Sequence, residues 1–467
     1  MKIYNTLTKH VDEFIPHNKD LVTMYTCGPT VYHYAHIGNL RTYIFEDVLE
    51  KTLNYLGYNV KRAMNITDVG HLTSDSDSGE DKMLKGAKRE HKTVLDIANF
   101  YTEAFKKDTE KLNIKWPEIV SKATDNIDEY LKIINALIKK GYAYQSGGNV
   151  YFDTSKLTDY YQLTNHKIDE MVVREGVEED KAKKNQADFA LWFTKSKFDD
   201  QELKWDSPFG LGYPGWHIEC SGISLKYLGE NLDIHCGGID NIFPHHTNEI
   251  AQSESYLGHK WCNYWIHGEH LNDETGKMSK SKGDFLTVNL LEEKGYNPIA
   301  YRFMCLNTSY RKVLVFSYDA LDKATTTYNK LKNKVLALKP SSLLEEEKYK
   351  EYDDKFKEFI SNDLNTSNAI TLIYEVLKSN LNDSTKYELI KSWDKVLSLD
   401  LTTLESNNID IDEEYIQKQI DLRNKAKQEK NYQLADQIRN DLAAKGIILK
   451  DTREATIYEI NTNISHN

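Results

Sequence analysis

The chain has 467 residues, of which 60 are Lys or Arg and 72 are Asp or Glu, so its formal net charge is −12. A content of 40% hydrophobic residues is enough to bury a sizeable core and excludes a mostly disordered chain. Its apolar runs are far shorter than the ~20 residues of a membrane helix, and its start has no signal-peptide pattern, so we expect a cytoplasmic protein with no membrane partner. Five cysteines, an odd and small number, favour reduced thiols or metal ligands over disulfides. The negative charge alone argues against a polyanionic partner.

The first hundred residues alternate between strand and helix patterns. Residues 21–26 and 59–66 have the pattern of short apolar strands, and residues 38–55 between them carry apolar side chains at helical spacing. This order predicts an α/β fold with a doubly wound, Rossmann-type parallel sheet, whose ligands bind at the carboxyl ends of the strands. Amphipathic helices are predicted near residues 93–112 and 125–140.

Farther along the chain the pattern changes twice. Residues 116–205 contain a Gly147-Gly148 turn and a charged run at 175–184 that we expect to be an exposed loop, so we interpret this stretch as an insertion in the sheet domain. Strand patterns return at 233–235 and 261–267, and residues beyond about 298 are almost entirely helical in periodicity. The predicted sheet domain has two halves, residues 1–115 and 206–297, separated by an insertion over residues 116–205. A helical bundle over residues 298–404 and a small final unit over residues 405–467 follow.

The first motif is His36-Ile37-Gly38-Asn39, at the turn between the first strand and its helix. The start of a helix favours a phosphate, Gly38 allows close approach of a nucleotide, and His36 can donate a hydrogen bond to a phosphoryl oxygen. Taken alone, four residues fit equally well a histidine in a βα turn that binds nothing.

The second motif, KMSKS, runs from Lys277 to Ser281 between two glycines. Two lysines, Lys277 and Lys280, and two hydroxyls in such a loop suit a clamp that neutralises the charge of a polyphosphate. The alternative is a solvated basic loop without a ligand.

The third pattern is a set of metal-ligand side chains. Cys27 precedes the phosphate turn, Cys220 follows an aromatic-rich segment, and two adjacent histidines lie three and four residues before Glu249. Two thiolates, an imidazole and a carboxylate form a zinc-type set. His245 at i,i+4 and His246 at i,i+3 can both share a helix face with Glu249, so spacing does not choose between them. Buried structural cysteines remain the alternative.

These motifs resemble those of a known family. HIGN and KMSKS resemble the two signatures of class I aminoacyl-tRNA synthetases, and CGPTVYHYAHIGN, GYPGWHIECS, DIHCGGIDNIFPHHTNEIAQ and KMSKSKGDF together resemble the cysteinyl-tRNA synthetases. The likeness runs from the first residues to about residue 450 and is weakest at 195–204 and 336–351. It implies a catalytic Rossmann-type domain, a helical bundle, and an anticodon-recognition domain over residues 405–467.

The resemblance also implies one zinc ion per chain, held by Cys27, Cys220, His245 and Glu249, with His246 as a bystander. Zinc would bind the thiolate of substrate cysteine, which a serine hydroxyl imitates poorly, so no editing domain is expected.

Further roles follow from the resemblance alone. The amino-acid pocket would be lined by Gly28, Thr67, Trp216 and His235. ATP would be held by His36, Gly38, Asn39, Asp240, Lys277 and Lys280, with Asp240 on the ribose and Lys280 on the triphosphate. Charge that develops during the reaction would be stabilised by His36, Asn39, Lys277 and Lys280. Mg²⁺ is expected on the leaving phosphates, without a dedicated protein site.

Two positions depart from the family pattern. His33 stands where many relatives carry Asp, which could shift the pH dependence near the nucleotide. Cys236 stands where Gly or Thr is common, and it is either an oxidisable thiol near the pocket or a small packing residue.

The implied partners are tRNA(Cys), L-cysteine and ATP, bound by a monomer. Residues 418–450 contain eight Lys or Arg and four Asp or Glu, a local excess of positive charge that suits phosphate contact within the acidic chain. A related ligase joins cysteine to an amino-sugar with the same core, but it has no need for such a C-terminal unit. A non-catalytic paralogue would be expected to lack the loop lysines or the zinc ligands.

Overall fold

The computed structural model divides the chain into two compact units, one formed by residues 1–288 and 298–401 and the other by residues 289–297 and 402–467. The residues that the structure describes are 1–69, 93–164, 181–195, 203–273, 276–277, 286–341, 343–403, 413–429, 431–444, 447–451 and 456–460.

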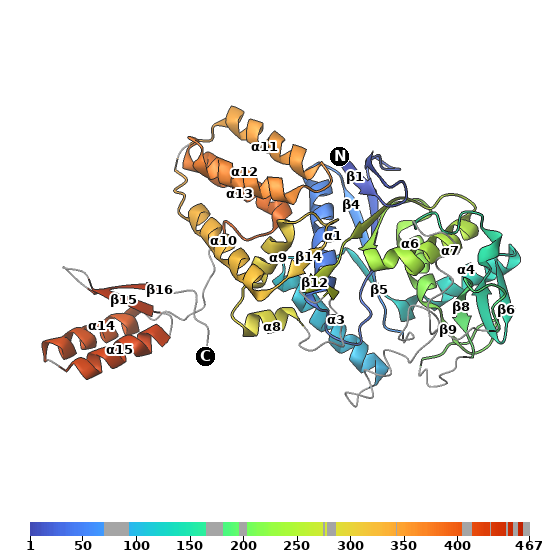
Figure 1. The fold of residues 1–467 in the computed structure, drawn as a ribbon, viewed down its shortest axis with the longest axis horizontal. Coiled ribbons are helices and arrows are strands. Elements are labelled where there is room, and N and C mark those ends of the chain that lie inside the picture. Colours follow the sequence, from blue (N-terminus) through green and yellow to red (C-terminus); the bar gives the residue numbers. More distant parts are fainter. Residues whose placement is uncertain are drawn as a thin grey trace. The chain divides into compact units, whose positions relative to one another are not determined.

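A five-stranded parallel sheet organises the first unit (Figure 1). In spatial order its strands are β11 (Cys262–Gly268), β10 (Leu232–Gly238), β3 (Val22–Thr26), β4 (Val60–Ile66) and β5 (Ile119–Lys122). All four neighbouring pairs run parallel. The chain moves outward from β3 to β5 and then returns on the other side of β3, so the strand order reverses between β3 and β10. The predicted doubly wound fold is confirmed, and this reversal is where such sheets bind ligands.

Helices cover both faces of the sheet. On one face lies α1 (Ile37–Tyr55), and on the other lie α6 (Trp216–Leu228), α7 (Thr247–Leu257) and α4 (Ile127–Lys139) (Figure 1). The side chains of β4 alternate accordingly. Arg62 points to α1, where it pairs with Glu46 and Glu50 at 3.3 Å each, whereas the next residue, Ala63, belongs to the apolar core on the α6 side.

The predicted helices near the start of the chain are confirmed within a few residues. Each begins at a side chain that caps its first turn: His36 for α1, and Thr93 for α3 (Val94–Lys111). The helix predicted over residues 125–140 corresponds to the 3₁₀ turn η1 (Ala123–Asn126) followed by α4.

A second sheet, antiparallel, follows in the chain. Its strands are β6 (Ala143–Ser146), β7 (Asn149–Phe152), β8 (Phe189–Phe193) and β9 (Tyr213–Pro214). The predicted Gly147-Gly148 turn joins β6 to β7, and both glycines have positive φ angles, 63° and 104°, as a two-residue hairpin requires. The 3₁₀ turn η2 (Thr154–Lys156) follows β7. Because β5 belongs to the parallel sheet, the sheet domain continues past residue 115. Most of the charged run at 175–184 lies outside the described residues.

Beyond residue 298 the first unit is mostly helical, as predicted. Its helices are α9 (Pro298–Leu306), α10 (Tyr318–Leu336), α11 (Glu346–Ile360), α12 (Thr366–Lys378) and α13 (Asp383–Leu397), of which the last three pack together (Figure 1). Arg302 of α9 joins this region to the sheet domain, because its Nη2 lies 2.6 Å from Oδ2 of Asp47 on α1.

One strand interrupts the helical region. β14 (Leu314–Phe316) pairs in parallel with β12 (Leu271–Asp273), which pairs antiparallel with β13 (Gly276–Lys277). At the start of the chain, β1 (Lys2–Asn5) and β2 (His10–Glu13) form a hairpin.

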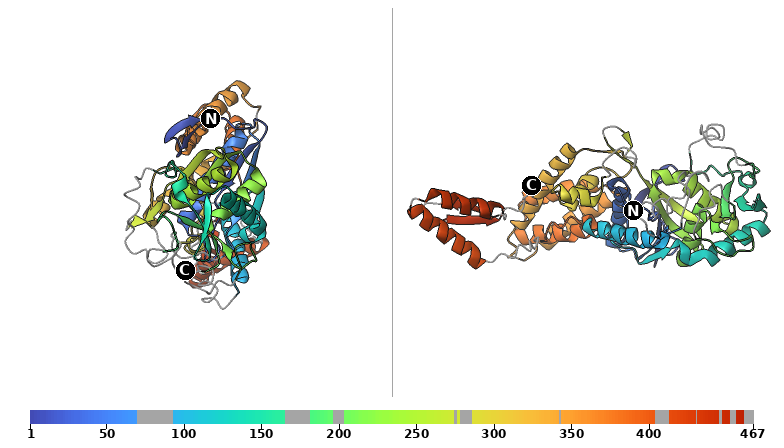
Figure 2. Two further views of the ribbon diagram at one scale, coloured as in Figure 1. Left: turned by 90° about the vertical axis from the view of Figure 1, so that its right-hand side faces the viewer. Right: turned by 90° about the horizontal axis from the view of Figure 1, so that it is seen from below.

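The second unit contains α14 (Glu413–Gln428) and α15 (Tyr432–Ala444), which lie side by side, and the hairpin of β15 (Ile447–Asp451) and β16 (Thr456–Ile460) (Figure 2). Its small apolar core is formed by Ile416, Ile420, Ile438, Leu442, Ile447 and Leu449. All of the short helix α8 (Val288–Glu293) except its first residue belongs to the other segment of this unit. In the described parts of the chain, no helix is both long and apolar enough to cross a membrane.

Candidate functional site

A cleft of about 350 Å³ opens at the carboxyl ends of β3 and β10, where the strand order reverses. Many of the predicted site residues line it: Cys27, Gly28, His36, Gly38, Asn39, Trp216 and Asp240. Others are buried beside the cleft rather than in its wall, with at most 3% of their surface exposed: Thr67, Cys220, His235, His245 and Glu249. Lys280 lies outside the described residues, and of Lys277 only the backbone in β13 is described.

At the nucleotide end of the cleft, His36 is the N-cap of α1. Its Nδ1 accepts a hydrogen bond from the Asn39 N–H at 3.1 Å, so the neutral ring carries its proton on Nε2, where it can donate. The Ile37 N–H donates to the carbonyl of Leu286 at 2.8 Å. Two N–H groups of the first turn are therefore already bonded, and an anion here would depend mainly on His36 and the helix dipole.

Asp240 has a partner in the cleft that the sequence did not reveal. The exposed Asp240 follows β10, and its Oδ1 lies 3.4 Å from Nε2 of His270, which comes just after β11. Both residues line the cleft. Because neighbouring parallel strands end at the same edge of a sheet, the position of His270 after a predicted strand was the signal that could have identified it.

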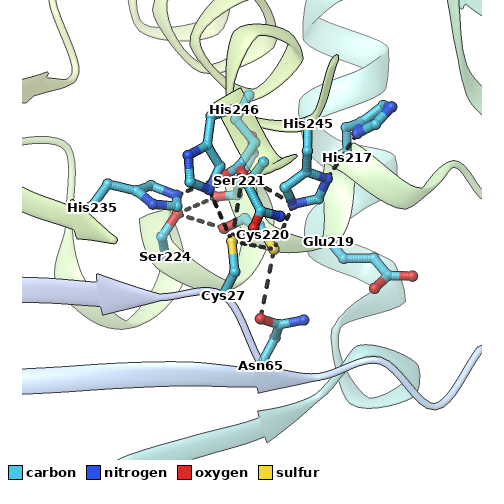
Figure 3. Close-up of polar contacts among 12 residues, drawn as sticks. Cys27, Asn65, His217, Glu219, Cys220, Ser221, Ser224, His235, His245 and His246 are labelled. Atoms are coloured by element: carbon cyan, nitrogen blue, oxygen red, sulfur yellow. Dashed lines mark hydrogen bonds and ion pairs between the residues drawn. The ribbon is translucent and has the colours of Figure 1, made fainter. Parts of the chain in front are cut away.

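The predicted metal ligands converge at one place, and Figure 3 shows the side chains of Cys27, Cys220 and His245 pointing toward one another. Sγ of Cys27 lies 3.9 Å from Sγ of Cys220 and 3.9 Å from Oε1 of Glu249. Nε2 of His245 lies 3.4 Å from Sγ of Cys220 and 3.1 Å from Oε1 of Glu249. His246 is equally close, with its Nε2 3.2 Å from Sγ of Cys27.

The side chains of this cluster come from four elements of the fold. Cys27 directly follows β3, Cys220 lies in α6, and Glu249 lies in the first turn of α7. The histidines precede α7 in a five-residue turn, η4 (Ile242–His246), which itself follows the 3₁₀ turn η3 (Ile239–Asn241). Ligand atoms lie within 4.8 Å of one another in two sets, Cys27 with Cys220, His245 and Glu249, and Cys27 with His235, His246 and Glu249, and each set could hold one metal ion.

Burial controls the charge of this cluster. It raises the pKa of the Cys27 thiol well above its usual range, and the nearby Cys220 and Glu249 raise it further. Burial also raises the pKa of Glu249 to about 8, against the opposing effect of His245. Because desolvation disfavours every charged form, these groups stay neutral unless a cation joins them.

More histidines surround the cluster. Nδ1 of His217 lies 2.9 Å from Nδ1 of His245, and Nδ1 of His246 lies 2.7 Å from Nε2 of His267. Nε2 of His235 lies 2.9 Å from Oε2 of Glu249. No role was predicted for His217 or His267, although His217 lies inside the GYPGWHIECS motif and His267 ends the strand predicted over residues 261–267.

The residues predicted for the amino-acid pocket divide into two groups. Gly28 and Trp216 line the cleft, and the Trp216 ring lies 4.8 Å from that of His245, centroid to centroid. Thr67 is 1% exposed and donates to Oε2 of the buried Glu219 at 2.9 Å. His235 is fully buried, with its ring stacked on Trp265 at 4.4 Å.

The two departures from the family pattern have different surroundings. Cys236 is fully buried, and burial raises its thiol pKa well above the usual range, which favours the packing interpretation over an oxidisable thiol. His33 lines the cleft, with its ring stacked on Tyr101 at a centroid distance of 6.0 Å.

Known proteins resemble this chain over nearly its whole length. Residues 13–326 match the family described as the catalytic domain of class I (C) tRNA synthetases. The chain is 45% identical to a cysteine–tRNA ligase of Treponema denticola, over 98% of this chain and 99% of the relative. It belongs to the cysteinyl-tRNA synthetase family. A cysteine–tRNA ligase of Borrelia garinii subsp. bavariensis is 46% identical over 98% of both chains.

A solved structure outside the cysteinyl-tRNA synthetases shares the fold. Methionyl-tRNA synthetase of Mycobacterium tuberculosis, in complex with methionyl-adenylate, aligns with a TM-score of 0.54 over 81% of this chain and 90% of its own. At 13% sequence identity, this likeness concerns the fold alone. It agrees with the Rossmann-type sheet of this cysteinyl-tRNA synthetase family member.

Proposed function

We propose that this chain is a cysteine–tRNA ligase. It would activate L-cysteine with ATP, giving cysteinyl-adenylate and pyrophosphate, and then transfer cysteine to the 3′-terminal adenosine of tRNA(Cys). The observation that carries the proposal is the 45% identity to a cysteine–tRNA ligase over 98% of this chain. The cluster of thiol, imidazole and carboxylate groups beside a cleft with the HIGN helix supports it.

The donor set fits a zinc ion. The half-buried thiol of Cys27 lies within a few ångströms of a buried thiol, imidazole and carboxyl group, and a divalent cation would allow the acidic groups to ionise there. We propose Cys27, Cys220, His245 and Glu249 as the ligands. When bound, zinc would supply a coordination site that a substrate thiolate fills well and a serine hydroxyl fills poorly.

The chain's own residues would position the reactants, because adenylate formation needs no side-chain nucleophile. His36 would donate from Nε2 to a phosphoryl oxygen of ATP, with Asn39 beside it. Asp240 would accept from the ribose hydroxyls. Lys277 and Lys280 would neutralise charge on the leaving pyrophosphate, together with Mg²⁺ carried by ATP.

We propose that the second unit recognises the anticodon of tRNA(Cys), that the protein acts as a monomer, and that it works in the cytoplasm. Of the domain boundaries predicted above, those at residues 298 and 405 stay part of this proposal. The local excess of Lys and Arg over Asp and Glu in residues 418–450 supports phosphate contact in this unit.

Exchange of radiolabelled pyrophosphate into ATP tests the proposal. Purified zinc-loaded protein should catalyse exchange that depends on cysteine, and it should transfer cysteine to tRNA(Cys). Absence of cysteine-dependent exchange would contradict the enzymatic assignment. Exchange without transfer to tRNA, but with transfer to an amino-sugar, would instead identify the ligase of small molecules.

A further inference from the structure

The turn that carries Cys27 interrupts the pairing of β3 with β4. The two strands pair in parallel as far as Thr26 and Met64, and an isolated bridge joins Thr30 to Thr67 farther on. Between these points the Gly28 N–H donates to a side chain of β4 at 2.7 Å, instead of to a backbone carbonyl. That side chain is the carboxamide of Asn65.

The buried side chain of Asn65 contacts several parts of the proposed cysteine site. Its Oδ1 accepts from the Gly28 N–H at 2.7 Å and from the Tyr25 hydroxyl at 3.1 Å, and Sγ of Cys220 lies 3.6 Å away (Figure 3). Its Nδ2 donates to Oγ1 of Thr67 at 3.0 Å. Asn65 itself is only 2% exposed, so water cannot easily replace these bonds.

The orientation of the carboxamide follows from its partners. A backbone N–H such as that of Gly28 only donates, so Oδ1 must face Gly28 and Nδ2 must face Thr67. The backbone of Asn65 also lies close to Gly28, since a Cβ added to Gly28 would lie 1.6 Å from the backbone carbonyl oxygen of Asn65. The hydroxyl proton of Thr67 is in turn used in the bond to Glu219 at 2.9 Å, which fixes the direction of the whole chain of bonds.

We propose that Asn65 is a positioning residue for cysteine recognition. Its carboxamide holds the Cys27–Gly28 turn and the Thr67 hydroxyl in fixed positions relative to Cys220. This inference rests on the proposed function. Cys27 and Gly28 line the cleft and Cys220 lies behind it. A shift of the Cys27–Gly28 turn therefore changes the distance between the Sγ atoms of Cys27 and Cys220 and the shape of the cleft beside them. The residues proposed to bind ATP, among them His36 and Asp240, are not among the hydrogen-bond partners of Asn65 given above.

The test is the full-length Asn65→Ala variant, measured by pyrophosphate exchange and by zinc titration. The KM for cysteine should rise about 10- to 100-fold, the range typical for loss of a residue that orients metal ligands, while the KM for ATP stays at the wild-type value. Zinc affinity should fall over the same range, and activation of serine relative to cysteine should increase.

Asn126→Ala is the matched control. Asn126 is equally buried in the same unit, and its Nδ2 donates to Oγ of Ser121 at 2.8 Å and to the carbonyl of Lys122 at 2.7 Å, away from the cleft. It should lower the melting temperature and leave the KM for cysteine unchanged. If it raised that KM as much as Asn65→Ala does, the effect would be a general loss of stability and the proposal would be overturned.

Asn65→Asp serves if the alanine variant does not fold. It keeps an acceptor for Gly28 but loses the donor to Thr67, so the Thr67 hydroxyl and the Cys27–Gly28 turn are no longer held together, and it too should raise the KM for cysteine and weaken zinc binding. A wild-type KM for cysteine together with wild-type zinc affinity in both variants overturns the proposal. If the wild-type protein shows no cysteine-dependent exchange, the proposed function is wrong, and unchanged zinc affinity in the variants still overturns this inference separately.

Discussion

Arg41 ties the HIGN helix to the chain segment that leads into the lysine loop. Its guanidinium, 4% exposed, donates to the carbonyl groups of Glu269 and His270 after β11 and to those of Ser309 and Lys312 before β14. A charged donor stabilises a buried bond by about 1.5–3 kcal/mol. If water replaced half of the four bonds in Arg41→Met, the loss would be about 3–6 kcal/mol.

Two measurements test this reasoning. At roughly 2 °C per kcal/mol for a large domain, the melting temperature should fall by about 6–12 °C. Because Glu269 and His270 line the cleft, the KM for ATP should rise about 10- to 100-fold while the KM for cysteine changes little. Arg311→Met is the control, since Arg311 pairs with Asp363 at 2.6 Å at the surface and its loss should cost about 1 kcal/mol or less. A wild-type melting temperature, or a lower one with unchanged KM for ATP, would refute the argument.

Three further variants test other parts of the site and fold. Burial raises the pKa of Glu46 to about 8 against the opposing effect of Arg62 at 3.3 Å, so the folded state binds a proton that the unfolded state releases, and wild-type stability should fall as pH rises from about 4.5 to 8. Glu46→Gln should reduce that fall in thermal melts across this range and leave the part contributed by Glu249, whose pKa burial also raises to about 8, and an unchanged pH profile would count against a protonated Glu46. Cys220→Ser should lower bound zinc, measured by atomic emission, and abolish discrimination against serine; a retained stoichiometry of one with intact selectivity would show that the ligand set is wrong. Lys280→Ala should slow adenylate formation about 100-fold or more in single-turnover assays while cysteine binding is kept, and a pure binding defect would exclude the proposed charge role.

Local pattern was sufficient for the parallel core of the fold. β3, α1 and β4 follow directly from short apolar runs and a helical repeat, and the turn between β3 and α1 carries its own motif. Because local pattern carries no information on pairing between distant segments, the strands that depend on such pairing were missed. β14 has three residues, and its partner β12 lies more than 40 residues earlier, so the pairing has no signal in either segment alone.

In the candidate site, too, some residues could be predicted from the sequence and others could not. Cys27, Cys220 and Glu249 could be proposed because thiols and carboxylates at such positions are unusual, and the structure brings them together. Asn65 could not, because an Asn inside an apolar strand has ordinary explanations until distant neighbours are placed beside it. The position of His270 after a predicted strand was a signal, but its contact with Asp240 follows only once the ends of the two strands lie side by side. The sequence left His245 and His246 open as ligands by spacing, and both lie close to Glu249 in the structure.

X-ray absorption at the zinc edge tests the central claim most directly, since it counts the sulfur atoms bound to the metal. The resting protein should show two sulfur ligands near 2.3 Å, from Cys27 and Cys220. Saturating cysteine should raise the count to three, and saturating serine should leave it at two. A count that stays at two with cysteine bound would contradict direct recognition of the substrate thiolate by zinc.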